Sequence, residues 1–181
     1  MLNNFLRVLV HILLPTRRPL IKFIRTISND FKDSNIIEIG SGNIDINQSM
    51  EKYFDKSSNF IQTDINKDYN HFFLDITEEI TTNQKFDLVL CTNVLEHIFE
   101  TKKAIKNLKT LLSDQGSLLV SVPFIYPLHD EPKDYWRFTE HSLRELFEDF
   151  VIEKFEYTGL RQFPIQYIFL LKIKHVKKKN I

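Results

Sequence analysis

Apolar and polar positions follow two spacings along the chain, one typical of strands and one typical of helices. Short runs rich in apolar and β-branched residues predict seven strands, at 36–39, 59–63, 71–74, 86–91, 117–122, 151–157 and 166–173. Helical spacing predicts helices at 47–54, at 94–112 and after Thr139, which suits an N-cap. This alternation indicates an α/β fold, with helices on both faces of a mainly parallel seven-stranded sheet.

The first 30 residues predict two short amphipathic helices that Pro15 separates. Their apolar positions are Leu2, Phe5, Leu6, Leu9, Val10 and Leu13 in the first, and Leu20, Phe23, Ile24 and Ile27 in the second. The runs are too short to span a bilayer, and no small-residue cleavage site of a signal peptide follows. We therefore expect two helices at 1–30 beside a domain at 31–181, within one globular unit.

Composition adds little, but the placement of charge is uneven. The net charge is zero, yet residues 1–29 and 157–181 carry basic side chains and no acidic ones. Such ends would suit an anionic membrane surface or nucleic acid, or would simply be solvated. Cys91 is the only cysteine, which excludes an internal disulfide and a Cys-rich metal site and fits a reducing compartment. We expect a cytoplasmic protein whose basic N- and C-terminal segments could contact the inner face of the membrane. The sequence leaves its oligomeric state open.

The first predicted strand ends in a glycine turn, Gly40-Ser-Gly42. Glycines there let the backbone turn sharply and approach a ligand without a Cβ in the way. Asp64 and Asp75 follow the next two strands, and the carboxyl ends of parallel strands line one crevice. Asp64 could accept hydrogen bonds from the hydroxyls of a ribose, and Asp75 could accept one from an adenine amino group. The backbone amides of the glycine turn could hold the polar tail of the ligand. Asp45, where a dinucleotide fingerprint has glycine, argues for a nucleoside without phosphates.

Residues 36–122 resemble a class I S-adenosylmethionine-dependent methyltransferase of the large small-molecule group often called type 11. The segments that carry the resemblance are Glu38-Ile-Gly-Ser-Gly42, Thr63-Asp64, Leu74-Asp75-Ile76-Thr77, Phe86-Asp-Leu-Val-Leu-Cys-Thr-Asn-Val-Leu-Glu-His97 and Leu111-Leu-Ser-Asp-Gln-Gly-Ser-Leu-Leu-Val-Ser-Val-Pro123. The segment His129-Asp-Glu-Pro-Lys-Asp-Tyr-Trp-Arg-Phe-Thr139 is similar to one in methyltransferase-like proteins associated with bacterial surface-polysaccharide synthesis.

The resemblance implies a Rossmann-like methyltransferase domain at 31–181 with S-adenosylmethionine as its cofactor. The cofactor-binding residues that it implies are Glu38, Gly40, Ser41, Gly42, Asp64, Ile65, Asp75, Ile76, Asn93 and Val94. The chain departs from the family at Ile44, where a third glycine is common, and in the minimal segment between the second and third strands.

Residues for the acceptor should follow the fourth and fifth strands. His97 and His129 are candidate general bases for an acceptor hydroxyl. The candidate acceptor-binding residues are Asp134, Tyr135, Trp136 and Arg137, since aromatic faces pack on sugars and Arg pairs with anions. The expected acceptor is a small molecule or a sugar of a surface glycan or its precursor. No metal site is predicted.

Three alternatives remain open at this stage. A non-catalytic binding or scaffold protein could keep the same fold. An NAD-dependent enzyme is disfavoured by Asp45 and by the segment from Val94 to His97. Nucleic-acid methylation is disfavoured because Cys91-Thr-Asn-Val94 lacks the Asn/Asp-Pro-Pro-aromatic signature of amino-group methylation.

Overall fold

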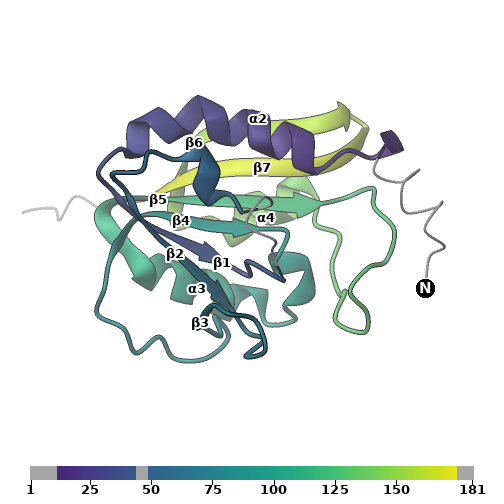
Figure 1. Ribbon diagram of the computed structural model, residues 1–181. Coiled ribbons are helices and arrows are strands. Elements are labelled where there is room, and N and C mark those ends of the chain that lie inside the picture. The colour runs from purple at the N-terminus through teal and green to yellow at the C-terminus, as the bar shows by residue number, and fades with distance from the viewer. Residues whose placement is uncertain (1–11, 44–48, 175–181) are drawn as a thin grey trace, which may run out of the picture.

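A seven-stranded sheet with the order β3-β2-β1-β4-β5-β7-β6 forms the centre of the protein (Figure 1). The computed structural model describes residues 12–43 and 49–174. The strands are β1 (Asn35–Ile39), β2 (Asn59–Asp64), β3 (Phe72–Phe73), β4 (Phe86–Thr92), β5 (Leu112–Pro123), β6 (Phe150–Leu160) and β7 (Phe163–Ile173). The first five are parallel, and β7 runs antiparallel to both β5 and β6. The predicted mainly parallel seven-stranded sheet is therefore confirmed.

Alternate residues of the central strands point to opposite faces, and a helix layer covers each face (Figure 1). The helix α2 (Arg17–Ile27) covers one face, where Phe23 and Ile24 pack in a cluster with Leu88. The helices α3 (Thr101–Leu111) and α4 (Glu140–Leu146) cover the other face. The second predicted amphipathic helix is therefore part of the sheet's own core. The first lies in residues outside the described ones.

The structure departs from the sequence pattern where the pattern is short or interrupted. The helix predicted at 94–112 is broken into a 3₁₀ turn, η4 (Leu95–His97), and α3. Ile98 is extended at the break, and its carbonyl accepts hydrogen bonds from the Thr101 hydroxyl and the Trp136 indole instead of from a helical amide. These two side-chain donors replace the helical hydrogen bonding that the apolar spacing predicted.

Smaller corrections concern lengths. The strand predicted at 71–74 is only the two residues of β3, and β5 starts earlier than 117, with a register shift against β4. Of the helix predicted at 47–54, the described part holds one 3₁₀ turn, η3 (Glu51–Tyr53). No helix is described between β2 and β3 or between β3 and β4, so Phe72 and Phe73 remain exposed.

The cap predicted at Thr139 is confirmed. The Thr139 hydroxyl accepts a hydrogen bond from the Ser142 amide at 3.1 Å, and the Ser142 hydroxyl accepts one from the Thr139 amide at 3.0 Å. This reciprocal arrangement fixes the residue at which the loop after β5 ends and α4 begins. Among the described residues, no helix is both long and apolar enough to cross a membrane.

The antiparallel pair at the sheet edge contributes an aromatic cluster to the core. Phe169 is fully buried, with its ring 5.4 Å from Phe147 and 4.7 Å from Phe155, whereas Phe163 on the same strand is 65% exposed. Phe169→Ala should lower the free energy of unfolding by about 3–5 kcal/mol, because it loses apolar burial and leaves a cavity. Phe163→Ala should change it by less than about 0.5 kcal/mol. Chemical denaturation measures both, and equal losses would contradict this assignment of the core.

Candidate functional site

The carboxyl ends of β1, β2 and β4 open onto a cavity of about 500 Å³. Its position agrees with the rule that ligands of open parallel sheets bind where the strand order reverses, here between β1 and β4. Its lining includes predicted cofactor and catalytic residues from four separate segments, namely Gly40, Asp64, Ile65, Asp75, Ile76, Asn93, Val94 and His97. The structure therefore brings together most of the predicted cofactor residues at one edge of the sheet.

The glycine turn after β1 has the backbone that only glycine adopts readily. Gly40 and Gly42 have φ of 67° and 71°. A Cβ built on Gly40 would lie 2.7 Å from Cγ2 of Val94, so the turn packs directly against the segment after β4. A Cβ on Gly42 would meet nothing within 4 Å. The two glycines thus serve different needs, close packing at Gly40 and backbone conformation at Gly42.

Asp64 ties the end of β2 to the glycine turn. One carboxylate oxygen accepts a hydrogen bond from the Gly42 amide and the other from the Asn66 amide, both at 2.8 Å. These amides hold the carboxylate in one orientation at the cavity, where its remaining lone pairs can accept further hydrogen bonds. His71 adds a contact between its Nε2 and the Gly42 carbonyl at 2.9 Å.

Asp75 lines the cavity as predicted, but it also forms a local turn. Its Oδ1 accepts hydrogen bonds from the Thr77 amide and hydroxyl at 2.8 and 2.6 Å. An Asp that bonds the backbone two residues on is a common turn former. The role of Asp75 toward adenine stays a prediction.

Glu38 and Ser41 lie behind the cavity rather than on its lining. The Glu38 side chain is buried, 4% exposed, and its carboxylate accepts a 3.3 Å hydrogen bond from the Ser41 hydroxyl. Burial raises the pKa of Glu38 to about 7, although hydrogen bonds from Gln62 and Ser41 oppose the shift. Glu38 therefore supports the glycine turn from inside the protein.

The loop after β5 is held by an ion pair between two of the predicted acceptor-binding residues, Asp134 and Arg137. Both oxygens of Asp134 contact the Arg137 guanidinium, at 2.6 and 2.7 Å, and Arg137 also donates to the carbonyls of Tyr126 and Pro127. Desolvation alone would raise the pKa of Asp134, but hydrogen bonds from Arg137 and the His129 amide lower it to about 2. Asp134 and Arg137 thus fix this loop, and neither is part of the cavity lining.

Tyr135 and Trp136 sit on Phe99, just before α3. The Tyr135 ring meets Phe99 edge-on at 5.6 Å, and the Trp136 ring stacks on it at 5.5 Å. Their amides both donate to the Glu96 carbonyl. Of the four predicted acceptor-binding residues, only Tyr135 lines the cavity, together with Asp130 and Lys133 of the same loop. Their contacts with an acceptor stay a prediction.

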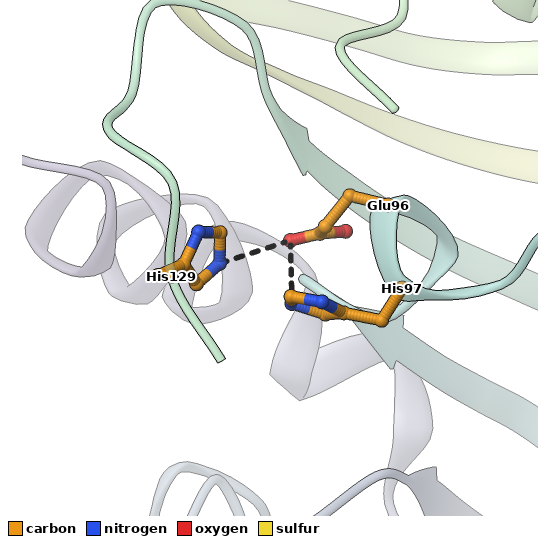
Figure 2. Close-up of side chains that lie close together, drawn as sticks. All are labelled: Glu96, His97 and His129. Carbon is orange, nitrogen blue, oxygen red and sulfur yellow. Dashed lines mark ion pairs between the residues drawn. The ribbon is translucent and has the colours of Figure 1, made fainter. Parts of the chain in front are cut away.

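His97 and His129, which are 32 positions apart in the chain, both face one oxygen of the Glu96 carboxylate (Figure 2). Each Nε2 is 3.9 Å from Oε1 of Glu96, and the two rings meet edge-on at 4.7 Å. Glu96 is fully buried, and neither of its oxygens has a hydrogen-bond partner. Burial raises the pKa of Glu96 to about 8 and lowers that of His129.

Sequence reasoning assigned no role to Glu96. Its signal was its place beside His97 in the Val-Leu-Glu-His segment, at the end of a strand. Glu96 lies beside His129 only because the loop after β5, more than thirty residues further along the chain, folds back onto it. No local sequence pattern predicts this contact.

The strand order, the glycine turn after β1 and the acid after β2 define a Rossmann-like fold of the class I methyltransferase type. A family model described as a methyltransferase domain matches residues 14–150, and the chain belongs to this family. We found no match among curated proteins.

Solved structures show the same fold at low sequence identity. A S-adenosylmethionine-dependent methyltransferase from Clostridium acetobutylicum is 12% identical, with 96% of this chain and 99% of that chain covered and a TM-score of 0.67. The N-methyltransferase NodS from Bradyrhizobium japonicum, in complex with S-adenosyl-L-homocysteine, is 16% identical over 89% of each chain, with a TM-score of 0.66. A 1,6-didemethyltoxoflavin-N1-methyltransferase from Burkholderia thailandensis, with 1,6-didemethyltoxoflavin and S-adenosylhomocysteine bound, is 14% identical. The match covers 86% of this chain and 78% of that chain, with a TM-score of 0.64.

The raised pKa of Glu38 predicts a specific dependence of stability on pH. The folded protein keeps the proton up to about pH 7, whereas the unfolded chain loses it near 4.5. This contribution to stability is complete below pH 4.5 and is lost as the pH rises to 7, by up to about 3 kcal/mol. In Glu38→Gln, unfolding measured without ligand should show a shallower decline over this window. The surface variant Glu145→Gln should follow the wild type, and identical slopes in Glu38→Gln and wild type would contradict the shift.

Proposed function

We propose that the protein is a methyltransferase that uses S-adenosylmethionine and acts on a small molecule or on a sugar of a surface glycan or its precursor. The observation that carries the proposal is the cavity at the switch between β1 and β4, in which a glycine turn, an oriented Asp64 and the segment after β4 converge. The methyltransferase-domain family supports the reaction class. The structural neighbours named as methyltransferases, two of them with S-adenosylhomocysteine, support the cofactor.

The residues present fit this cofactor. Asp64 is held with lone pairs available for ribose hydroxyls, and Ile65 and Ile76 give the cavity apolar surface for a base. Positive φ at Gly40 and Gly42 allows the turn to bring its backbone close to the amino-acid end. Asn93 and Val94 would border the same end from the β4 side. A cavity of about 500 Å³ falls within the range of small-ligand sites, about 300–1,000 Å³.

The chain's task in the reaction is mainly alignment. When bound, S-adenosylmethionine supplies a methyl group on a positively charged sulfur, which is an excellent leaving group. The protein must therefore hold the acceptor atom in line with that bond and exclude water. A hydroxyl acceptor also needs to lose a proton. His97, which lines the cavity, and His129, whose ring contacts that of His97, are the candidate bases.

The acceptor side of the cavity suits a polar ring. Tyr135 is 44% exposed and offers an aromatic face, and Asp130 and Lys133 offer charged partners nearby. Aromatic faces pack on the C–H surfaces of sugars, while charged groups bind their hydroxyls. These features, with the loop's similarity to polysaccharide-associated proteins, favour a glycan-type acceptor.

Calorimetric titration with S-adenosylmethionine and S-adenosylhomocysteine tests the cofactor. Wild type should bind both, and Asp64→Asn should weaken binding by about 10- to 100-fold, because a charged acceptor of ribose hydrogen bonds is lost. Gly40→Val should abolish binding, since its side chain would collide with Val94. The matched control Asp68→Ala, an exposed acid of the same loop, should bind like wild type.

A fold check and a transfer assay complete this test. Circular dichroism must show Asp64→Asn folded before its weaker binding is interpreted. Absence of binding by folded wild type, or unchanged binding in Asp64→Asn, would refute the cofactor assignment. Binding without methyl transfer from labelled cofactor to any small-molecule, glycan or lipid fraction would favour the non-catalytic binding protein instead.

A further inference from the structure

Glu96 is a buried acid close to the cavity, and its carboxyl oxygens have no hydrogen-bond partner among the described residues. A fully buried carboxylate without a hydrogen bond is costly, because it has lost water and gained nothing in its place. The two side-chain nitrogens that face it, from His97 and His129, lie at 3.9 Å, which is beyond hydrogen-bond distance. Neither histidine therefore forms a hydrogen bond with the Glu96 carboxyl group.

The other nitrogen of each ring shows what those two nitrogens offer. The Nδ1 of His97 lies 2.7 Å from the Lys133 carbonyl, which can only accept, so this nitrogen carries the proton. The Nδ1 of His129 lies 3.2 Å from the Pro127 carbonyl and 3.3 Å from the Asp134 carboxylate, which accept, and 3.5 Å from the Arg137 guanidinium, which donates. The two nearer acceptors favour a proton on this nitrogen. With the proton of each neutral ring on Nδ1, Nε2 presents a lone pair toward Glu96. Once Glu96 loses its proton, as a metal ligand must, three electron-pair donors converge.

We propose that Glu96, His97 and His129 form a binding site for a divalent transition-metal cation. Their ligand atoms all lie within 4.8 Å of one another (Figure 2). Sequence reasoning predicted no metal site, because the three residues are contributed by η4 and by the distant loop after β5.

The two distances between a histidine Nε2 and Oε1 of Glu96 are close to the distances between ligands of a bound ion. Ligands about 2.1 Å from a tetrahedral ion lie roughly 3.4 Å apart, so each 3.9 Å separation would close by about 0.5 Å on binding. Two imidazoles and one carboxylate suit zinc and its neighbours better than magnesium, which prefers oxygen ligands. The Nδ1 contacts are those that orient metal-binding histidines in known sites, including the carboxylate–histidine pair of Asp134 and His129.

Three protein ligands would leave a coordination position for another molecule. His97 also lines the cavity beside the predicted cofactor residues, so this position would face the acceptor. A cation there would bind a hydroxyl or carboxylate oxygen of the acceptor. That role rests on the proposed function, whereas the cation site itself does not.

Titration of tag-free, chelator-treated protein with Zn²⁺ alone, in the absence of cofactor, tests the site. Wild type should bind one equivalent, with a raised unfolding temperature, and should bind Mg²⁺ at least 100-fold more weakly. Glu96→Gln and His129→Gln should each weaken Zn²⁺ binding by at least 10-fold. His141→Ala, which removes an exposed histidine of α4, is the matched control and should bind like wild type.

A second readout separates lost ligation from lost folding. Co²⁺ in place of Zn²⁺ should give visible absorption bands of a four- or five-coordinate site in wild type and in His141→Ala, and not in Glu96→Gln. Without metal, Glu96→Gln should unfold at the same or a higher temperature than wild type, because it removes a buried, unpartnered carboxylate. Absence of Zn²⁺ binding by folded wild type, binding unchanged in both ligand variants, or a preference for Mg²⁺ would overturn the proposal. Zn²⁺ binding without S-adenosylmethionine binding would leave it standing and refute only the proposed cofactor.

Discussion

The close approach of Gly40 to Val94 is the constraint on which the site depends. This contact packs the residue after β1 against a residue after β4, and the strand order reverses between these two strands. No side chain larger than hydrogen fits at residue 40 without displacing Val94. The Asp64 carboxylate then ties the same turn to β2 through the Gly42 amide. Three strand ends are thus held in one arrangement, and the cavity lies over them.

The site has two halves that are stabilised by different kinds of interaction. The half near β1 and β2 is built from backbone conformation and amide hydrogen bonds to one carboxylate. The other half is built from charged and aromatic side chains of η4 and the loop after β5, which the Asp134–Arg137 pair holds in place.

Sequence reasoning predicted the first half well and the second poorly. The strands, the glycine turn and Asp64 follow from local spacing, because strand ends and turns leave a signal in neighbouring residues. The break before α3 does not, because Trp136 supplies a hydrogen bond to Ile98 from 38 residues away. Arg137 and Asp134, expected at the acceptor, bind each other, and only the folded loop shows that two histidines face one oxygen of Glu96.

We propose that the cavity over β1, β2 and β4 holds S-adenosylmethionine. The most direct measurement is a crystal structure of the protein in complex with S-adenosylhomocysteine. We expect the ribose hydroxyls to bind the Asp64 carboxylate and the amino-acid end of the ligand to lie beside the turn of Gly40 and Gly42. Density for the ligand elsewhere on the protein, or ribose hydroxyls without contact to Asp64, would contradict it.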